Sequence, residues 1–202
     1  YWFQSTGAVR SRLPLSFNPS SAGMVQRNIL EKCQFGTRIP VGQGADMAVL
    51  GTAMHACIAL SFTDRTVALS EKEVQKILSG FGVLEQLSPS NVLQQVRALH
   101  DWIASRWPDA KAHAEIPVQS VLSNGQILNG RIDLLLDTAD GWILIDHKSS
   151  QLRPEHWDQL ADEHAAQMAA YAGAVHQASG RQVIENWLFF PVVAGAMRIE
   201  FS

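Results

Sequence analysis

The sequence predicts an α/β or α+β domain in which helices pack on a sheet. Three observations lead to this class. Apolar residues follow helical spacing over much of residues 46–107, strand-like segments replace this pattern from residue 112, and a helix with two more strands follows. At 202 residues and 47% hydrophobic content, the chain is long and apolar enough to bury one sizeable core.

Residues 1–45 are predicted to form an irregular basic segment ahead of a folded domain over residues 46–202. Pro14 and Pro19 interrupt this segment, although a short helix over residues 20–32 is compatible with its pattern. The segment carries a net charge of +4, against −7 for the rest of a chain whose total is −3. A positive arm on an acidic body suits a charged partner or an adjoining domain, and it equally suits a solvated surface segment.

Three helices are expected before the strands, and each has a recognisable start. Asp46 can cap the first helix, and Ser70 with Glu73 matches the capping box Ser-x-x-Glu of the second. Pro89 suits the first turn of the third. The expected ranges are 47–62, 70–78 and 88–107.

The second half of the chain is expected to contain five strands and one further helix. Ser123-Asn124-Gly125 is a hairpin signal between the first two strands, and Gly180 can stop the helix. The expected strands cover residues 112–122, 126–137, 141–148, 183–193 and 197–201, and the helix covers residues 164–179.

Composition excludes several classes of protein. No apolar run approaches the roughly 18 residues of a membrane span. A pI near 6.2 argues against a strongly basic nucleic-acid binder, although a local basic surface remains compatible with it. Cys33 and Cys57 are too few for a disulfide framework and too far apart for a zinc knuckle, so a buried free Cys57 thiol and a reducing compartment are expected.

Two acidic residues and a lysine are expected to meet on neighbouring strands. Asp146 and Lys148 lie on one face of their strand because side chains alternate. With the turn at residues 138–141, paired residue numbers sum to 279 and Asp133 lies opposite Asp146. With a two-residue turn at residues 140–141, the sum is 281 and Asp133 faces Lys148. Either register puts all three side chains on one face.

Such a cluster within apolar strands predicts a metal site. Buried carboxylates without partners tend to protonate, whereas a hard divalent cation such as Mg²⁺ or Mn²⁺ suits their oxygens. Lys148 can orient or help deprotonate a water at the ion, as metal-assisted phosphodiester hydrolysis requires. A purely structural buried salt bridge of Lys148 with Asp133 or Asp146 is the alternative.

These residues resemble a known motif. Gly130-x-x-Asp133, followed about a dozen residues later by Asp146-x-Lys148, resembles the core of the PD-(D/E)XK nucleases. The segment from Leu50 to His55 resembles the helical motif of the RecB/AddA-type exonuclease branch. The resemblance implies a restriction-endonuclease-like core with a central mixed sheet, and a His55 that binds metal together with Asp133 and Asp146.

Two further motifs of this branch have counterparts. Glu115-Ile116-Pro117 resembles the acidic motif on its first strand, and Gln167 with Tyr171 resembles a Gln-x-x-x-Tyr helix that lies near metal and DNA. The resemblance implies that Glu115 orients Lys148 or helps hold a second ion, and that the backbone carbonyl of His147 is a third oxygen ligand. A three-residue loop at residues 123–125 would place Glu115 opposite Asp133, whereas a two-residue Asn-Gly turn would send it to the other face.

The resemblance implies a function and its partners. The expected activity is that of a Mg²⁺- or Mn²⁺-dependent DNase, the nuclease module of a helicase–nuclease in recombinational DNA repair. Residues 1–45 would then link it to an upstream superfamily 1 helicase. Its partner would be a second nuclease subunit, and its location the bacterial cytoplasm, at the nucleoid. The alternative is a catalytically silent nuclease-fold domain that binds DNA or a partner protein. The proline of the family name is absent before Asp133. The sequence also lacks the four cysteines of an iron–sulfur cluster and a Walker A motif.

Overall fold

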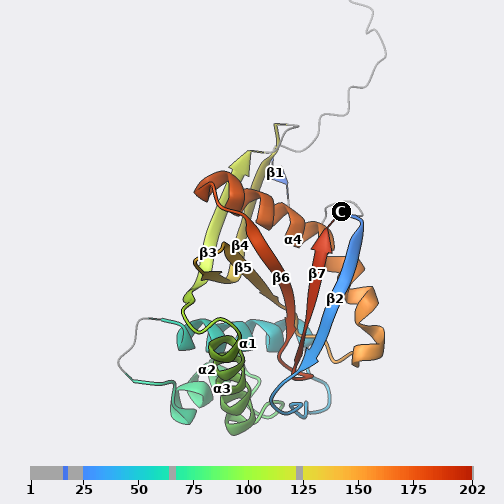
Figure 1. Ribbon diagram of the computed structural model, residues 1–202. Coiled ribbons are helices and arrows are strands. Elements are labelled where there is room, and N and C mark those ends of the chain that lie inside the picture. Colours follow the sequence, from blue (N-terminus) through green and yellow to red (C-terminus); the bar gives the residue numbers. More distant parts are fainter. Residues whose placement is uncertain (1–15, 18–24, 64–66, 122–124, 202) are drawn as a thin grey trace, which may run out of the picture.

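A seven-stranded mixed sheet forms the centre of the computed structural model (Figure 1), which describes residues 16–17, 25–63, 67–121 and 125–201. The strand order is β1-β4-β5-β6-β7-β2, and β3 pairs with β4. The β1–β4 and β5–β6 pairs are parallel and the others antiparallel. The strands are β1 (Ser16–Phe17), β2 (Arg27–Gln34), β3 (Lys111–Val121), β4 (Ile127–Asp137), β5 (Trp142–His147), β6 (Val183–Phe190) and β7 (Gly195–Phe201).

Helices cover both faces of the sheet. The helices α1 (Met47–Ser61), α2 (Glu71–Gly80) and α3 (Pro89–Arg106) pack on one face, and α4 (Trp157–Ser179) packs on the other. In β5, Ile143 and Ile145 enter the core under α1 to α3, while Leu144 enters the core under α4. This alternation is the reason that a strand covered on both faces is almost continuously apolar.

The helix starts follow the capping residues identified in the sequence. The Asp46 carboxylate accepts from the backbone N–H of Ala48, and Ser70 with Glu73 forms a complete capping box. α4 begins at Trp157, seven residues before the predicted start. Its first two turns alternate buried apolar and exposed acidic positions, a pattern less obvious than the alanine-rich run that follows.

The prediction of an irregular or helical segment was wrong for residues 27–34. These residues form β2, an edge strand antiparallel to β7, so the described sheet begins before residue 46. The strand was missed because Glu31 occupies a half-buried position, where its charge is neutralised by Arg106 at 2.7 Å. The predicted linker role falls largely on residues 1–15 and 18–24, which lie outside the described residues.

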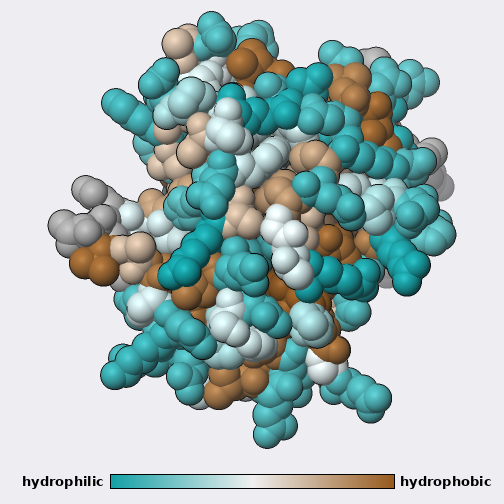
Figure 2. All heavy atoms as spheres, turned by 60° about the horizontal axis from the view of Figure 1, so that its bottom comes forward, coloured by the Kyte–Doolittle hydropathy of each residue, from teal (hydrophilic) through white to brown (hydrophobic). Residues whose placement is uncertain are grey.

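Two basic residues of the segment 1–45 form ion pairs within the fold. Arg27 lies 2.8 Å from Asp162 and Lys32 lies 3.0 Å from Asp158, so both basic residues tie β2 to α4. These ion pairs are partly exposed and contribute little to stability. Seen from the end that carries α1 to α3, the surface is mainly hydrophilic, with hydrophobic residues in separate groups (Figure 2).

The alternation of side chains between the two faces of the sheet is interrupted in the middle of the β3–β4 ladder. Ile132 lies in the core under α4, whereas Leu134 lies in the core under α1 to α3, so the regular alternation of faces breaks at Asp133. The neighbouring Glu115 has a φ of 55°, which is costly for a residue with a Cβ. Unusual backbone of this kind is frequent at functional sites. At this break in the ladder, the Asp133 carboxylate lies against His55 on α1.

Candidate active site

The register of the strands agrees with one predicted alternative at each hairpin. Leu134 pairs with Ile145, so the partner numbers sum to 279 as in the first predicted register, and the regular pairing ends one step before Asp133 and Asp146. In the first hairpin, Ile116 pairs with Ile132, which is the register of the three-residue loop and sets Glu115 level with Asp133. The regular pairing stops at these acidic residues.

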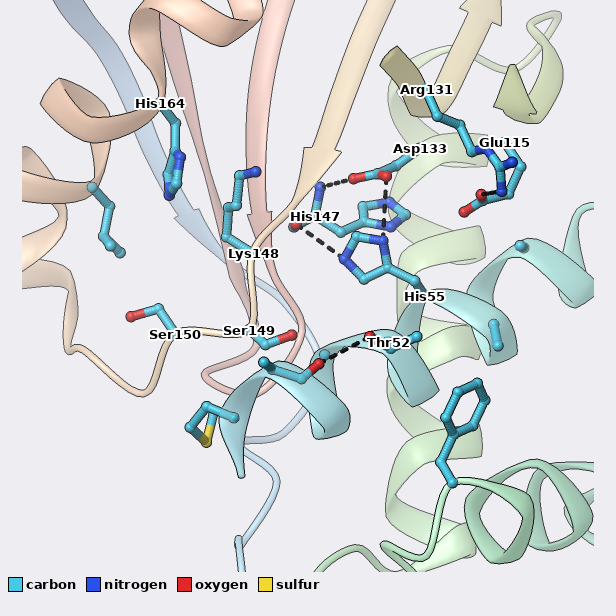
Figure 3. Close-up of a pocket in the computed structure, with 17 residues that line it drawn as sticks. Thr52, His55, Glu115, Arg131, Asp133, His147, Lys148, Ser149, Ser150 and His164 are labelled. Atoms are coloured by element: carbon cyan, nitrogen blue, oxygen red, sulfur yellow. Dashed lines mark hydrogen bonds and ion pairs between the residues drawn. The ribbon is translucent and has the colours of Figure 1, made fainter. Parts of the chain in front are cut away.

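Asp133 is held by donors from two elements. Its Oδ1 lies 3.2 Å from Nδ1 of His55 on α1, and its Oδ2 accepts from the backbone N–H of His147 at 2.7 Å (Figure 3). Burial would raise the pKa of Asp133, but these hydrogen bonds and the positive charge of His55 lower it to about 2. Asp133 is therefore an anion at neutral pH.

α1 is able to bring His55 to this position because Gly51 leaves room beneath it. A Cβ at Gly51 would lie 2.6 Å from Oγ of Ser149, in the segment that follows β5. Burial opposes protonation of His55, but the hydrogen bond to Asp133 and its charge raise the His55 pKa overall. Gly51 lets α1 approach the segment after β5, and His55, one turn later, thereby reaches Asp133.

His147 contributes more than the sequence predicts. Its backbone carbonyl lies 3.1 Å from Nε2 of His55, and its ring is also close to the group. Within the described chain, both ring nitrogens are buried without a hydrogen-bond partner, and burial lowers the pKa of His147 to about 3. A neutral imidazole whose ring nitrogens have no other partner can coordinate a metal ion.

His55, Asp133 and His147 fit a divalent cation. One potential ligand atom from each lies within 4.8 Å of the other two. The unpaired ring nitrogens of His147 are a specific reason to place an ion here, since buried polar groups rarely lack a partner. The carboxylate suits Mg²⁺ or Mn²⁺ and the imidazoles suit transition ions. Asp146 was expected in the ligand set and lies outside this particular group in the described residues.

Asp146 instead faces Lys148. The ammonium Nζ lies 2.8 Å from Oδ2, and only 3% of Asp146 is exposed. Burial raises the pKa of Asp146 to about 6, against the opposing effect of the Lys148 charge, and the nearby charge of Asp133 raises it further. The pKa of Asp146 is therefore well above that of Asp133, and the Lys148 ammonium favours the charged form of Asp146.

Gln167 and Tyr171 connect Lys148 to β4. Oε1 of Gln167 accepts from Nζ of Lys148 at 3.0 Å, and Nε2 of Gln167 donates to the Tyr171 hydroxyl at 3.4 Å. That hydroxyl also accepts from the backbone N–H of Arg131. A Cβ at Gly130 would lie 2.6 Å from the Tyr171 ring, so the glycine of the motif makes room for the tyrosine of the helix. Tyr171 is buried, with 4% exposure, and supports the site rather than lining it.

Glu115 forms an ion pair with Arg131, 3.0 Å away, at the rim of the site. In the described contacts, Lys148 is oriented by Asp146 and Gln167, and not by Glu115 as expected. The Glu115 carboxylate is therefore placed beside the site by an arginine that the sequence analysis did not consider.

A cavity of about 900 Å³ opens over these residues. Its lining includes His55, Glu115, Asp133, His147 and Lys148 from the expected set. It also includes residues that the sequence analysis did not single out: Ser149, Ser150, Leu160 and His164. The spacing of His164 and Gln167 on one helical face would have been the signal for His164.

The comparisons with known proteins agree with this geometry. The model of the PD-(D/E)XK nuclease superfamily matches residues 32–200. A protein from Oceanobacillus iheyensis, described as a subunit of an ATP-dependent helicase/nuclease, is 27% identical over 163 residues, which cover 69% of this chain and 13% of that protein. Proteins of the same description from Lactiplantibacillus plantarum (27% over 170 residues, 73% of this chain and 13% of that protein) and Desulforudis audaxviator (30% over 103 residues, 49% and 8%) are also similar. The chain thus spans roughly a tenth of the length of the curated relatives it matches.

The fold and the free cysteines also agree with expectation. The mixed sheet with helices on both faces is the restriction-endonuclease-like α/β core that the motifs implied. Cys33 and Cys57 are both free, and Cys57 is buried in the core. None of the described helices combines the length and apolar character needed to cross a bilayer.

Proposed function

The chain belongs to the PD-(D/E)XK nuclease superfamily, and from this premise we propose that it is a metal-dependent deoxyribonuclease that hydrolyses phosphodiester bonds of DNA. The observation that carries the proposal is the joint placement of a metal-binding group and a buried acid–lysine pair under one cavity. The His55, Asp133 and His147 group supplies the first part, and Asp146 with Lys148 supplies the second.

We propose Mg²⁺ or Mn²⁺ as the cofactor. His55, Asp133, Asp146 and His147 would hold it, the last through its carbonyl oxygen or its unpaired ring. When bound, the ion supplies a Lewis acid that polarises the phosphate and lowers the pKa of water. Glu115 stands close enough to the rim for a role with a second ion.

Lys148 has the central role among the protein's own groups. Lys148 lines the cavity and its ammonium lies between Asp146 and Gln167, from where it can position the attacking water and stabilise negative charge on the phosphate. Gln167 contacts the ammonium from α4 and Tyr171 supports Gln167, so both residues would help position bound DNA through Lys148.

The wider setting is proposed from the relatives. Three similar proteins carry a description that combines a helicase and a nuclease. We propose that this chain serves as the nuclease module of such a protein in recombinational DNA repair. A superfamily 1 helicase would deliver the DNA, a second nuclease subunit would be a partner, and the complex would act in the bacterial cytoplasm at the nucleoid.

The test is a cleavage assay on end-labelled single- and double-stranded DNA with Mg²⁺, Mn²⁺ or EDTA. We expect cleavage only with metal, and we expect Asp146→Ala to abolish it while the protein stays folded. A silent DNA-binding domain would bind the same DNA without cutting it under any of these conditions. Titration with Mn²⁺ separates the two functions further, because a catalytic site binds the ion at the carboxylates.

A further inference from the structure

His164 faces the cavity from the opposite side to His55. It lies on α4 one turn before Gln167, so both side chains project from one face of the helix. Figure 3 shows its ring directed into the cavity on the side of Lys148 and Ser150, away from the Glu115–Arg131 pair. Two histidines from different helices therefore enter one site, and only His55 belongs to the metal-binding group.

The two histidines differ in what they already bind. His55 is engaged at both nitrogens, by Asp133 and by the carbonyl of His147. Among the residues that the structure describes, no group forms a hydrogen bond or ion pair with the His164 ring. A half-buried imidazole in a cavity wall, with both nitrogens available, is equipped to bind a ligand.

The chemistry of the ligand follows from the surroundings of His164. Burial and the adjacent Lys148 charge lower its pKa to about 4, so the ring is neutral at physiological pH. A neutral imidazole does not repel the Lys148 ammonium, and it offers one N–H hydrogen-bond donor. A phosphate attracted by the ammonium of Lys148 would supply the missing acceptor.

We propose that His164 is a substrate-contacting residue that donates a hydrogen bond to a phosphate oxygen of the DNA strand bound over Lys148. The inference rests on the proposed nuclease function and extends it, because it assigns the α4 wall of the cavity to the DNA backbone and the α1 wall to the metal. His164 takes no part in holding the ion.

Three substitutions separate a hydrogen bond from packing. His164→Ala removes the ring, His164→Gln keeps an N–H donor, and His164→Phe keeps a ring without a donor. His176→Ala is the matched control, because His176 is an exposed histidine near the end of the same helix and does not line the cavity. Each protein is assayed for kcat and KM on a single-stranded oligonucleotide with Mg²⁺, for the Kd of that oligonucleotide with Ca²⁺, and for Mn²⁺ affinity.

We expect His164→Ala and His164→Phe to raise KM and Kd about 10- to 100-fold, the effect of losing one hydrogen bond to a charged group. His164→Gln should restore most of the affinity. The values of kcat and Mn²⁺ affinity should stay close to those of the wild type, as should all properties of His176→Ala.

Two results would overturn the inference. If His164→Phe has the KM and Kd of the wild type, His164 only fills space. If Mn²⁺ affinity falls in step with a rise in KM, His164 is a metal ligand. If the wild type binds the oligonucleotide without cutting it, the proposed nuclease function fails, while the Kd series still decides the role of His164.

Discussion

The two acidic residues of the site belong to adjacent strands, yet their surroundings give them different pKa values. Asp133 accepts a backbone hydrogen bond and lies against His55, and its pKa falls to about 2. Asp146 is deeper, its neighbouring cation is Lys148, and its pKa rises to about 6. The carboxyl beside His55 is therefore ionised over a wide pH range, whereas the carboxyl beside Lys148 holds its proton up to a higher pH.

This difference shows how one pair of carboxylates can serve two purposes. Directed donors stabilise the charged form of Asp133 before any metal binds. Burial without such donors leaves Asp146 responsive to its neighbours, so the arrival of an ion would change its protonation more than that of Asp133. Substitutions that remove one carboxylate or its partner at a time should therefore have different effects.

Loss of Asp133 should be the most severe change. We expect Asp133→Ala to abolish cleavage and Mn²⁺ binding, because the ion would lose the carboxylate that lies between His55 and His147. It should also destabilise the metal-free protein by about 1–3 kcal/mol, because the His147 N–H loses its acceptor. Cleavage assays and urea unfolding in EDTA measure the two effects.

Asp146→Ala is the comparison for that stability measurement. It relieves repulsion between two buried carboxylates, so the metal-free protein should keep its stability or gain some. A structural salt bridge predicts the opposite, a loss of about 3–5 kcal/mol in both Asp146→Ala and Lys148→Ala. Equal losses in both variants, without metal-dependent cleavage by the wild type, would contradict the catalytic proposal.

Lys148→Ala should affect the reaction rather than the ion. We expect cleavage to slow by roughly 10²–10⁴-fold, the range for a lost acid–base or positioning group. Mn²⁺ affinity should be retained, because the ammonium is no ligand. Isothermal titration beside the nuclease assay tests both statements, and a variant that cuts at the wild-type rate would remove Lys148 from the mechanism.

Gln167→Ala should have a smaller effect of the same kind. It removes the hydrogen bond that orients Lys148, so we expect kcat to fall about 10-fold, in line with the loss of one hydrogen bond to a charged group. Tyr171→Phe removes only the hydroxyl and should reduce kcat less. The matched control is Gln177→Ala, on the same helix, where Gln177 contacts Ser120 at an exposed position. It should leave kcat unchanged.

The pH dependence of stability should be the mildest signature. A folded-state pKa of Asp146 raised to about 6 means that the folded protein holds a proton that the unfolded chain has already released above about pH 4. The stability of the metal-free protein should therefore contain a component that falls as pH rises from about 4 to about 6. Asp146→Asn should remove this component in EDTA, and an unchanged pH profile in that variant would contradict the assignment.

Asp133 contributes with the opposite sign. Its folded-state pKa is depressed, so its contribution is present above about pH 4 and is lost as pH falls toward 2. Chemical unfolding at a series of pH values distinguishes the two aspartates, because their windows lie on opposite sides of pH 4.

Much of the fold and part of the site were readable from local patterns. Capping residues located the starts of α1 and α2, and one predicted alternative at each hairpin matches the observed pairs of Leu134 with Ile145 and of Ile116 with Ile132. Both properties depend on residues close together in the chain, where spacing alone decides which side chains can meet.

Other features depended on partners far away in sequence. β2 was missed because its inward Glu31 is neutralised by Arg106, and the Glu115 side chain turns to Arg131 at a break in the ladder. The need for Gly130 becomes apparent only when Tyr171 packs on it.

From the sequence alone we could predict the order of helices and strands after residue 46, two alternative registers at each hairpin and the residue types needed for metal chemistry, because periodicity, capping and turn length are local properties. Only the packed structure shows that the pKa of Asp133 is lowered and that of Asp146 is raised, that the His147 ring lies beside His55 and Asp133, and that His164 lines the cavity. Burial, distance between charges and the direction of a side chain arise only when separate elements pack together, and these quantities set the chemistry of each residue.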